Sequence, residues 1–329
     1  MSGAVATVQQ IASAGGAHLP GLMERVEERL RELAAGHGPL LARHAGDTIA
    51  AGGKRLRPLL VLLAAGEGAR RGPELIGAAA AVELIHSATL VHDDVLDAAP
   101  LRRGSPTVWA QGGRALAIAT GDLLFSRAFA ELTAAGSLES VRALSRATSA
   151  LAEGELLQRQ DAWNGDVPVA RYLLRCELKT ARLFEASCEL GALAAQAPVE
   201  QVQALGGFGR AVGVAFQLLD DVLDVAGPAS VTGKSRGTDL LDGTVTLPLI
   251  LARARDPRLA AVDLRSITTA EQAEELCARI EATGALDGSR EHALQIVDEA
   301  RRVLDDVALE DGQRQALGLL AESVVARRA

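Results

Sequence analysis

Two identical acidic pentapeptides carry the clearest chemistry in this chain. The sequence Asp-Asp-Val-Leu-Asp occurs at residues 93–97 and again at 220–224, each time inside an apolar helical run. Residues four apart lie on one face of an α-helix, so the first and third aspartates of each cluster point the same way. Like charges at this spacing repel unless a cation lies between them, and oxygen ligands suit Mg²⁺, which commonly shares its coordination with phosphates. Two such clusters facing each other would clamp a diphosphate.

Histidine and arginine side chains accompany the first cluster. At ~100° per residue, Asp93 and Asp97 fall within about 20° of the direction in which His86 points. Arg102 and Arg103 follow in the loop beyond the acidic helix, where guanidinium groups suit phosphate oxygens. The alternative is that both arginines only cap the helix and neutralise the aspartates. The presence of a second acidic cluster favours the phosphate role.

Cationic and polar residues recur elsewhere. Residues 52–58, Gly-Gly-Lys-Arg-Leu-Arg-Pro, place three cations in a glycine-opened turn before an apolar helix, which predicts a phosphate site that needs no metal. Such a turn, taken alone, is usually solvated surface. Gln217 lies on the acidic stripe, three residues before Asp220, whereas Lys179 and Thr180 carry little signal by themselves.

Composition excludes several classes of function. Hydrophobic residues make up 48% of the 329 residues, which permits a large core, while aromatic residues make up only 2% and the net charge is −8. Both values argue against nucleic-acid binding. Three cysteines without metal-ligand spacing indicate a reduced, cytoplasmic protein. The apolar stretch 75–85 is interrupted by Glu83 and is too short to cross a bilayer, so no transmembrane segment is expected.

Helical periodicity dominates the chain and predicts an all-α bundle of long helices. Residues 1–20 are expected to form a disordered N-terminal tail and residues 21–329 a single helical domain. No segment shows the alternation expected of strands. Asp305-Asp306 imitates the acidic motif without its third aspartate and is predicted to be a solvated face. Long helices are expected at 22–35, 75–97, 114–132, 140–162, 169–195 and 204–225.

Together the motifs resemble those of the all-trans polyprenyl diphosphate synthases, which have the isoprenoid-synthase fold. The similarity runs from about Leu22 to the C-terminus. It rests on 52–58, the two acidic motifs with Arg102-Arg103-Gly104, Gly121-Asp122, Lys179-Thr180, 216–219, Gly233-Lys234 and 246–248. The resemblance implies long helices around a deep central cavity, in a homodimer. It also implies a prenyltransferase that condenses isopentenyl diphosphate with an allylic prenyl diphosphate to give a longer all-trans product.

The resemblance further implies roles for individual residues. Mg²⁺, as three ions bound with the substrate diphosphate, would be held chiefly by Asp93, Asp97 and Asp220, supported by Asp94, Asp221 and Asp224. The allylic substrate would contact Arg102, Lys179, Thr180, Gln217 and Lys234. Isopentenyl diphosphate would be held by Lys54, Arg57, His86 and Arg103. The residues expected to act in catalysis are Asp93, Asp94, Asp97, Asp220 and Lys179.

The implied reaction begins when charge stabilisation lets the allylic C–O bond ionise. The isopentenyl double bond then attacks the carbocation, and a proton is lost to the released diphosphate. Water must be excluded, so the cationic loop 232–239 is predicted to close as a lid, although an ordinary glycine-rich connection is the alternative. One residue departs from the pattern, because Gly243 is followed by Thr244 where many relatives have lysine.

Product length is predicted from two positions before the first cluster. In the family, bulky side chains four and five residues before the first aspartate stop the growing chain, and these positions are Thr89 and Ala88. Thr89 lies on the Asp93 stripe, whereas Ala88 lies off it. A long product of the quinone side-chain type is therefore expected. A short-chain synthase of the geranylgeranyl or farnesyl type is the alternative.

Three other functions are compatible with parts of the sequence. A class I terpene cyclase would not need the basic turn 52–58, and its second metal motif carries Asn, Ser and Glu. A non-catalytic synthase subunit tends to lose aspartates, yet all six are present here. A helical scaffold that binds divalent ions would leave Arg102-Arg103 unexplained.

Overall fold

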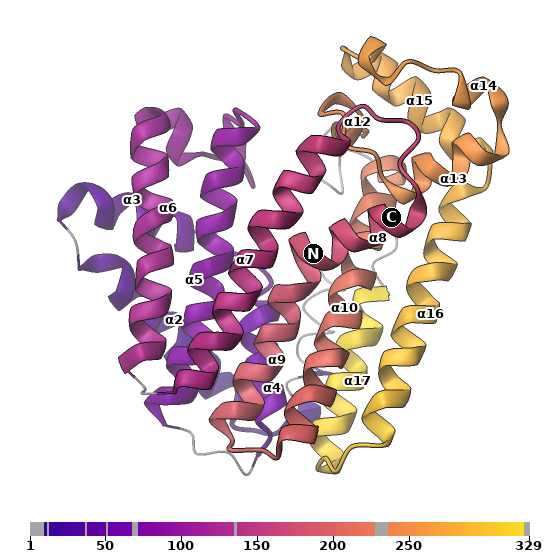
Figure 1. Ribbon diagram of the computed structural model, residues 1–329. Coiled ribbons are helices and arrows are strands. Elements are labelled where there is room, and N and C mark those ends of the chain that lie inside the picture. The colour runs from indigo at the N-terminus through magenta and orange to yellow at the C-terminus, as the bar shows by residue number, and fades with distance from the viewer. Residues whose placement is uncertain are drawn as a thin grey trace. The chain divides into compact units, whose positions relative to one another are not determined.

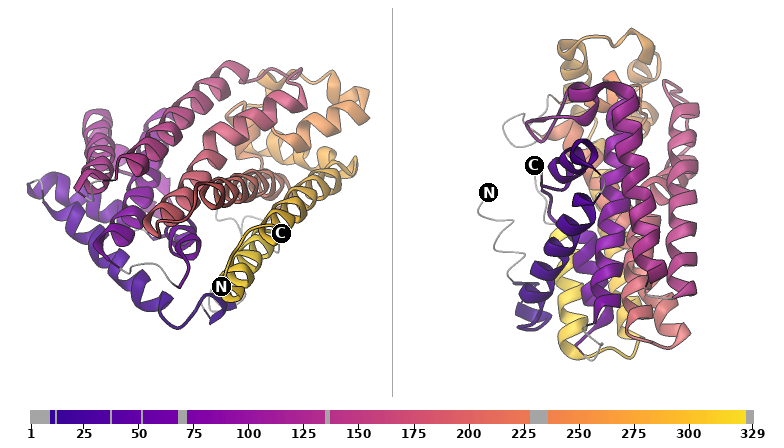
Figure 2. Two further views of the ribbon diagram at one scale, coloured as in Figure 1. Left: turned by 60° about the horizontal axis from the view of Figure 1, so that its bottom comes forward. Right: turned by 90° about the vertical axis from the view of Figure 1, so that its left-hand side faces the viewer.

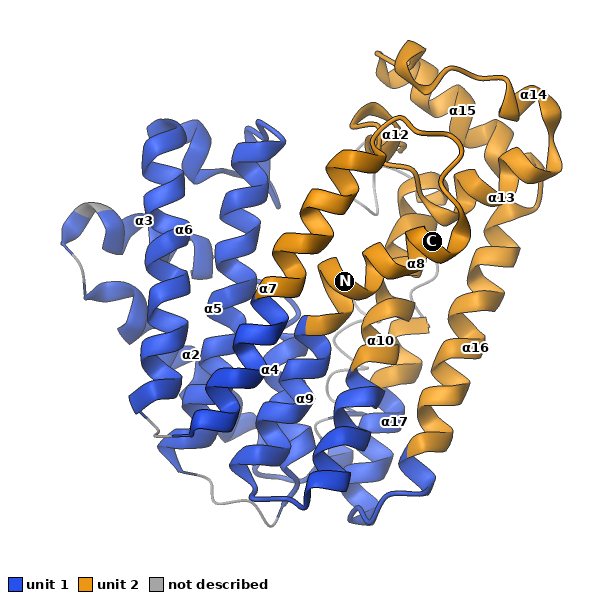
Figure 3. Ribbon diagram, in the orientation of Figure 1, with its two compact units in different colours: residues 1–148, 183–209, 304–319 blue, residues 149–182, 210–303, 320–329 orange. Residues whose placement is uncertain are grey.

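The computed structural model describes residues 10, 11, 13–36, 38–50, 52–67, 72–134, 137–227 and 236–325 (Figure 1). The chain divides into two compact units (Figure 3). Unit 1 comprises residues 1–148, 183–209 and 304–319, and unit 2 comprises 149–182, 210–303 and 320–329. Because long helices run from one unit into the other, this division does not test the expectation of one domain over 21–329, which stays a prediction.

Unit 1 is built around one central helix, α5 (Pro73–Leu96), which packs against α2, α4 and α6. Figure 2 shows these helices, coloured indigo to purple, lying alongside one another. Pro73 favours a helix start, and the small side chains at 77–81 allow neighbouring helices to approach closely. The other elements that begin in this unit are α2 (Leu19–Ala35), α3 (Pro39–Ala50), α4 (Leu56–Ala65), β1 (Leu101–Arg102), β2 (Ser105–Pro106), α6 (Val108–Ala134) and α7 (Leu138–Asp161).

Unit 2 contains α8 (Val169–Cys176), which continues through a π-helical turn, η1 (Glu177–Ala181), into α9 (Arg182–Ala194). α9 belongs mostly to unit 1, and α10 (Val199–Ala226) passes from unit 1 into unit 2. The remaining elements are α12 (Thr238–Leu241), α13 (Leu247–Arg255), α14 (Pro257–Ala260), the 3₁₀ turn η2 (Leu264–Ser266), α15 (Ala270–Ala282), α16 (Ala285–Asp305) and α17 (Asp311–Val325). The last two residues of α16 and most of α17 belong to unit 1.

The predicted all-α class is confirmed, with one correction. β1 and β2 form a short antiparallel hairpin in which Leu101 pairs with Pro106 and Arg102 with Ser105. Its two-residue turn places Arg103 at φ 53° and Gly104 at φ 79°, as a hairpin of this length requires. Two-residue strands are too short to leave an alternating pattern, so the sequence did not predict them. The long helices lie close to their expected ranges, although the helix expected at 114–132 begins at Val108 and is interrupted at Gly113 (φ 74°).

Three further expectations meet the structure. In the predicted tail, Ile11 is only 1% exposed, while residues 1–9 and 12 lie outside the described part of the chain. Asp305 and Asp306 are exposed, as expected for a solvated face. The argument from length against a membrane span was wrong, because the stretch 75–85 belongs to the 24-residue helix α5. By length and composition both α5 and α10 are apolar enough to span a bilayer, but 78% and 50% of their apolar windows are buried, as in core helices.

Candidate active site

The first acidic cluster lies at the C-terminal end of α5, where its neighbours leave one face accessible. His86, Thr89 and Asp93 are partly exposed, and Asp97 is exposed. Their spacing of three and four residues places them on one stripe. Asp94 is off this stripe and is only 4% exposed. The helix predicted to carry this stripe is therefore confirmed, while the roles of His86, Asp93 and Asp97 stay predictions.

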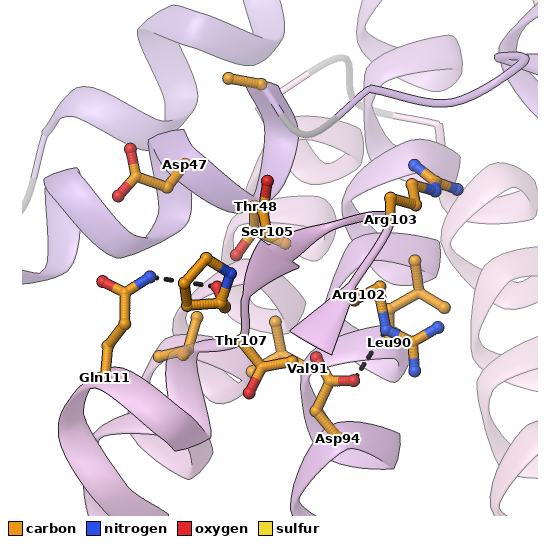
Figure 4. Close-up of a pocket in the computed structure, with 13 residues that line it drawn as sticks. Asp47, Thr48, Leu90, Val91, Asp94, Arg102, Arg103, Ser105, Thr107 and Gln111 are labelled. Atoms are coloured by element: carbon orange, nitrogen blue, oxygen red, sulfur yellow. Dashed lines mark hydrogen bonds and ion pairs between the residues drawn. The ribbon is translucent and has the colours of Figure 1, made fainter. Parts of the chain in front are cut away.

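Asp94 is held by the hairpin. Arg102 Nε donates to Asp94 Oδ1 across 2.7 Å, and the pair lines a pocket of about 390 Å³ (Figure 4). Arg103 lines the same pocket but points away from that pair (Figure 4). For Arg102, the structure favours the alternative that it neutralises an aspartate.

A group of cations surrounds His86. Burial lowers the pKa of His86 well below its usual value, and the charges of Arg57, Arg103, Arg102 and Arg55 lower it further. Arg103 passes so close to Gly53 that an added Cβ there would lie 3.1 Å from Nη1. The guanidinium of Arg57 lies 4.6 Å from the ring centroid of Phe184. The structure thus brings together three of the four residues predicted to bind isopentenyl diphosphate. The fourth, Lys54, lies exposed on the same turn.

Arg55 differs from its neighbours in the basic turn. Its guanidinium forms ion pairs of 2.6 Å with Glu27 and with Glu83, and its side chain is only 11% exposed. Arg55 is also in the left-handed conformation, at φ 47°. Of the three cations in 52–58, this one fastens the turn to α2 and α5.

The second acidic cluster repeats the arrangement of the first on α10. Gln217, Asp220 and Asp224 are partly exposed at a spacing of three and four, whereas Asp221 is only 4% exposed. Tyr172 Oη donates to Asp221 Oδ2 across 2.6 Å, and Gln217 Nε2 donates to Oδ1 across 2.8 Å. In both motifs the first and third aspartates stay accessible, and the second is buried and bound by a group from another element.

A further carboxylate, Asp239, stands beside this cluster. Its backbone N–H donates to Asp224 Oδ2 across 3.2 Å. Burial and the Asp239 charge raise the pKa of both Asp221 and Asp224. Crowded carboxylates of this kind are stabilised by a cation, so the donor set fits a hard divalent ion. Among the described residues no three acidic, histidine or cysteine side chains form a ready-made ligand set.

The remaining predicted allylic contacts are engaged within unit 2. Lys179 Nζ donates to Glu155 Oε2 on α7, and this cation lowers the pKa of Glu155. Thr180 Oγ1 donates to Gln217 Oε1 across 2.7 Å. Lys234 and most of the predicted lid, residues 228–235, lie outside the described part of the chain.

The two predicted chain-length positions differ in their surroundings. Ala88 is fully buried at 0% exposure. Thr89 is partly exposed and donates from Oγ1 to the backbone carbonyl of His86 across 2.8 Å. A larger side chain therefore has room at Thr89 and must displace packed atoms at Ala88.

Sequence reasoning missed several residues around the second cluster. Tyr172 is the one tyrosine in the chain and lies seven residues before Lys179, a signal that was available. Asp239 was noted only as part of a loop. Glu155 and Arg175 are ordinary charged helix residues in the sequence, and only the fold shows that Arg175 is 4% exposed and lies over the Tyr172 ring at 5.3 Å.

Comparison with known proteins gives a consistent result. Residues 39–282 match the family described as polyprenyl synthetase. The heptaprenyl diphosphate synthase component 2 of Geobacillus stearothermophilus is 41% identical over 303 residues, which cover 88% of this chain and 94% of that protein. The decaprenyl diphosphate synthase of Rhodobacter capsulatus has a similar crystal structure, with TM-score 0.89, 37% identity and coverage of 98% of this chain and 99% of that one.

A third relative was solved with bound molecules. It is a polyprenyl synthase from Caulobacter crescentus CB15, complexed with calcium and isoprenyl diphosphate. Its TM-score is 0.86 at 36% identity, with 98% of each chain covered. Matches of this identity and coverage establish the relationship that the motifs predicted. The chain belongs to the polyprenyl synthetase family.

Proposed function

We propose that this chain is an all-trans polyprenyl diphosphate synthase that adds isopentenyl diphosphate to an allylic prenyl diphosphate. The observation that carries the proposal is the repeated arrangement of the two acidic motifs. In each, the outer aspartates form an accessible stripe and the middle aspartate is buried. Membership of the polyprenyl synthetase family supports the reaction class.

The outer aspartates are assigned to the metal. Asp93 and Asp97 on α5, and Asp220 and Asp224 on α10, would hold Mg²⁺ with the allylic diphosphate, with three ions expected when substrate is bound. The Caulobacter crescentus relative was solved in complex with calcium and isoprenyl diphosphate, which supports the binding of a divalent cation. Magnesium dependence is a general property of the family. When bound, the metal supplies positive charge that stabilises the departing diphosphate. Asp94 and Asp221 are assigned the lesser task of supporting the outer residues.

The cations near His86 are assigned to isopentenyl diphosphate. Arg57 and Arg103 surround His86, and their mutual repulsion falls when an anion binds between them. Lys54 adds a flexible charge from the same turn. His86 stays neutral and donates one hydrogen bond. These residues orient the isopentenyl double bond for attack on the allylic carbocation.

The polar residues of unit 2 are assigned to the allylic diphosphate. Lys179, Thr180 and Gln217 contact it, together with Lys234 as the family resemblance predicts. Arg102, which the resemblance also assigns here, is bound to Asp94 through Nε and would reach the diphosphate only through its two terminal nitrogens. Lys179 must leave Glu155 to do so, since the two form an ion pair. The proton lost after attack passes to the released diphosphate.

The product is a long-chain polyprenyl diphosphate. The absence of a bulky side chain at Ala88 and Thr89 supports this length, as do the heptaprenyl and decaprenyl names of the relatives. A cytoplasmic homodimer is the expected form. The relative named component 2 raises the alternative that a second protein is needed, which an assay of the purified chain alone decides.

The proposal is tested with purified protein, Mg²⁺, labelled isopentenyl diphosphate and a series of allylic primers. Extended diphosphates are expected, and reverse-phase chromatography gives their length. Cyclic hydrocarbons would indicate a terpene cyclase. Asp93→Ala combined with Asp220→Ala should abolish elongation. Elongation at the wild-type rate in that double variant would contradict the proposal.

A further inference from the structure

A buried tyrosine holds the second acidic motif from a neighbouring helix. Tyr172 on α8 is 0% exposed, and its hydroxyl donates to Asp221 Oδ2 across 2.6 Å. A buried hydroxyl needs a partner, and a bond to a carboxylate is stronger than one between neutral groups. The contact therefore ties α8 to α10 at one defined point.

The hydrogen bonds continue on the other side of Asp221. Its second oxygen, Oδ1, accepts from Gln217 Nε2 across 2.8 Å, and Gln217 Oε1 accepts from Thr180 Oγ1 across 2.7 Å. Asp221 is thus oriented by a hydroxyl and an amide, whereas Asp94 in the first motif is bound by the cation of Arg102. Both donors are neutral, so each orients the carboxylate through a hydrogen bond alone, while the charge of Arg175 also acts on Asp221.

The π-helical turn explains how the continuous run of α8 and η1 contributes both Tyr172 and Thr180 to the hydrogen bonds around Asp221 and Gln217. In a regular α-helix the eight steps from Tyr172 to Thr180 turn through ~800°, which leaves the two side chains about 80° apart. η1 (Glu177–Ala181) accommodates one extra residue between them. The rotation from Tyr172 to Thr180 then equals that of seven regular steps, and the two side chains come within about 20° of each other. Both face α10 for this reason.

The same network sets the position of Lys179. Lys179 precedes Thr180 inside η1. Because the hydrogen bond to Gln217 holds Thr180 in place, it also holds the backbone that carries Lys179. On α10, Asp220 is the neighbour of the anchored Asp221. The separation between Lys179 and Asp220 is therefore determined by the bonds of Tyr172 and Thr180 to α10.

We propose that Tyr172 is a positioning residue of the prenyl transfer, which acts through Asp221 to hold Lys179 and Asp220 at the spacing that the metal-bound allylic diphosphate requires. This inference rests on the proposed function. It assigns Tyr172 no contact with substrate.

The test is Tyr172→Phe, which removes the hydroxyl and keeps the ring. We expect kcat/KM for the allylic diphosphate to fall roughly 10-fold, the size of one hydrogen bond to a charged group. The Mg²⁺ concentration for half-maximal rate should rise several-fold, while KM for isopentenyl diphosphate stays within about two-fold. In an Asp221→Asn background, Tyr172→Phe should have no further effect, because Tyr172 acts through that carboxylate.

Ser289→Ala is the matched control, since Ser289 is also fully buried in unit 2 and its hydroxyl donates to the carbonyl of Ala285. The inference would be overturned if Tyr172→Phe had the same kinetics as this control. It would also be overturned if kcat/KM fell equally for the allylic diphosphate and for isopentenyl diphosphate. If Tyr172→Phe does not fold, Asp221→Asn weakens the same bond from the acceptor side and should give the same split between substrates. A wild-type protein that elongates no primer would contradict the proposed function instead.

Discussion

Arg102 Nε and Asp94 Oδ1 lie 2.7 Å apart, with the aspartate side chain only 6% exposed. A buried carboxylate that loses its cation keeps its desolvation penalty without compensation. We therefore expect Arg102→Gln to lower the free energy of unfolding by about 1–3 kcal/mol, the range for a hydrogen bond to a charged group. Chemical unfolding followed by circular dichroism measures the change.

The control for this ion pair is Arg142→Gln. Arg142 pairs with Glu139 at a similar distance of 2.7 Å, but both side chains are about 60% exposed. Exposed pairs contribute little, so the change should stay below about 0.5 kcal/mol. Equal changes in the two variants would show that the burial of Asp94 is not what makes Arg102 important to stability.

Lys179 is expected to compete between Glu155 and the allylic diphosphate. Glu155→Gln removes the charge that holds the lysine in the free protein, so the lysine reaches the substrate more easily. Because partly exposed ion pairs contribute about 0.5–1 kcal/mol, KM for the allylic substrate should fall about 2- to 5-fold. Steady-state kinetics check this, with Glu153→Gln as the control because Glu153 is an exposed acid on the same helix. A raised KM would mean that Glu155 orients Lys179 productively.

The sequence was sufficient to predict the acidic stripes but not the partners of the buried aspartates. Asp93 and Asp97 share a face because helical geometry is local, and the same holds for Gln217 and Asp220. The partners of Asp94 and Asp221 come from other elements, and helical spacing carries no information about them. Tyr172 is 49 residues from Asp221, so only tertiary packing brings them together.

The basic turn at 52–58 shows a second limit of prediction from the sequence. Lys54, Arg55 and Arg57 are equivalent cations in the sequence, and helix propensity does not separate them. In the structure Arg55 forms ion pairs with Glu27 and Glu83, and its backbone is left-handed, neither of which the sequence pattern indicates. The π-helical turn at 177–181 is similarly invisible to a period of 3.6 residues, and the expected single helix over 169–195 did not anticipate it.

His86 should remain neutral well below the usual histidine range. Burial and the arginine charges lower its pKa in the folded state, while the unfolded state keeps a pKa near 6.5. As the pH falls below about 6.5, the unfolded chain therefore gains a proton that the folded chain does not, and stability is lost at up to about 1.4 kcal/mol per pH unit. NMR of the histidine Cε1–H resonances should show a signal that does not titrate between pH 7.5 and 5.5.

His86→Gln assigns that resonance and serves as the control for stability. The glutamine cannot titrate, so the loss of stability below pH 6.5 should be smaller in the variant than in the wild type. A His86 resonance that titrates near pH 6.5 would mean that the arginines do not act on the ring, and the anion site built from them would need to be reconsidered.

Product length should respond to the two positions before Asp93 in different ways. Thr89 is partly exposed on the acidic stripe, so Thr89→Phe can place its ring along that stripe, and we expect shorter products with little loss of stability. Ala88 is fully buried, so Ala88→Phe must displace packed atoms at a cost of about 1–3 kcal/mol. Shortening is expected there as well, but with a lower melting temperature. Reverse-phase chromatography of the products and thermal unfolding separate the two effects. An unchanged product distribution in Thr89→Phe would mean that the growing prenyl chain does not pass along this stripe. An unchanged distribution in a folded Ala88→Phe would mean that Ala88 does not limit product length.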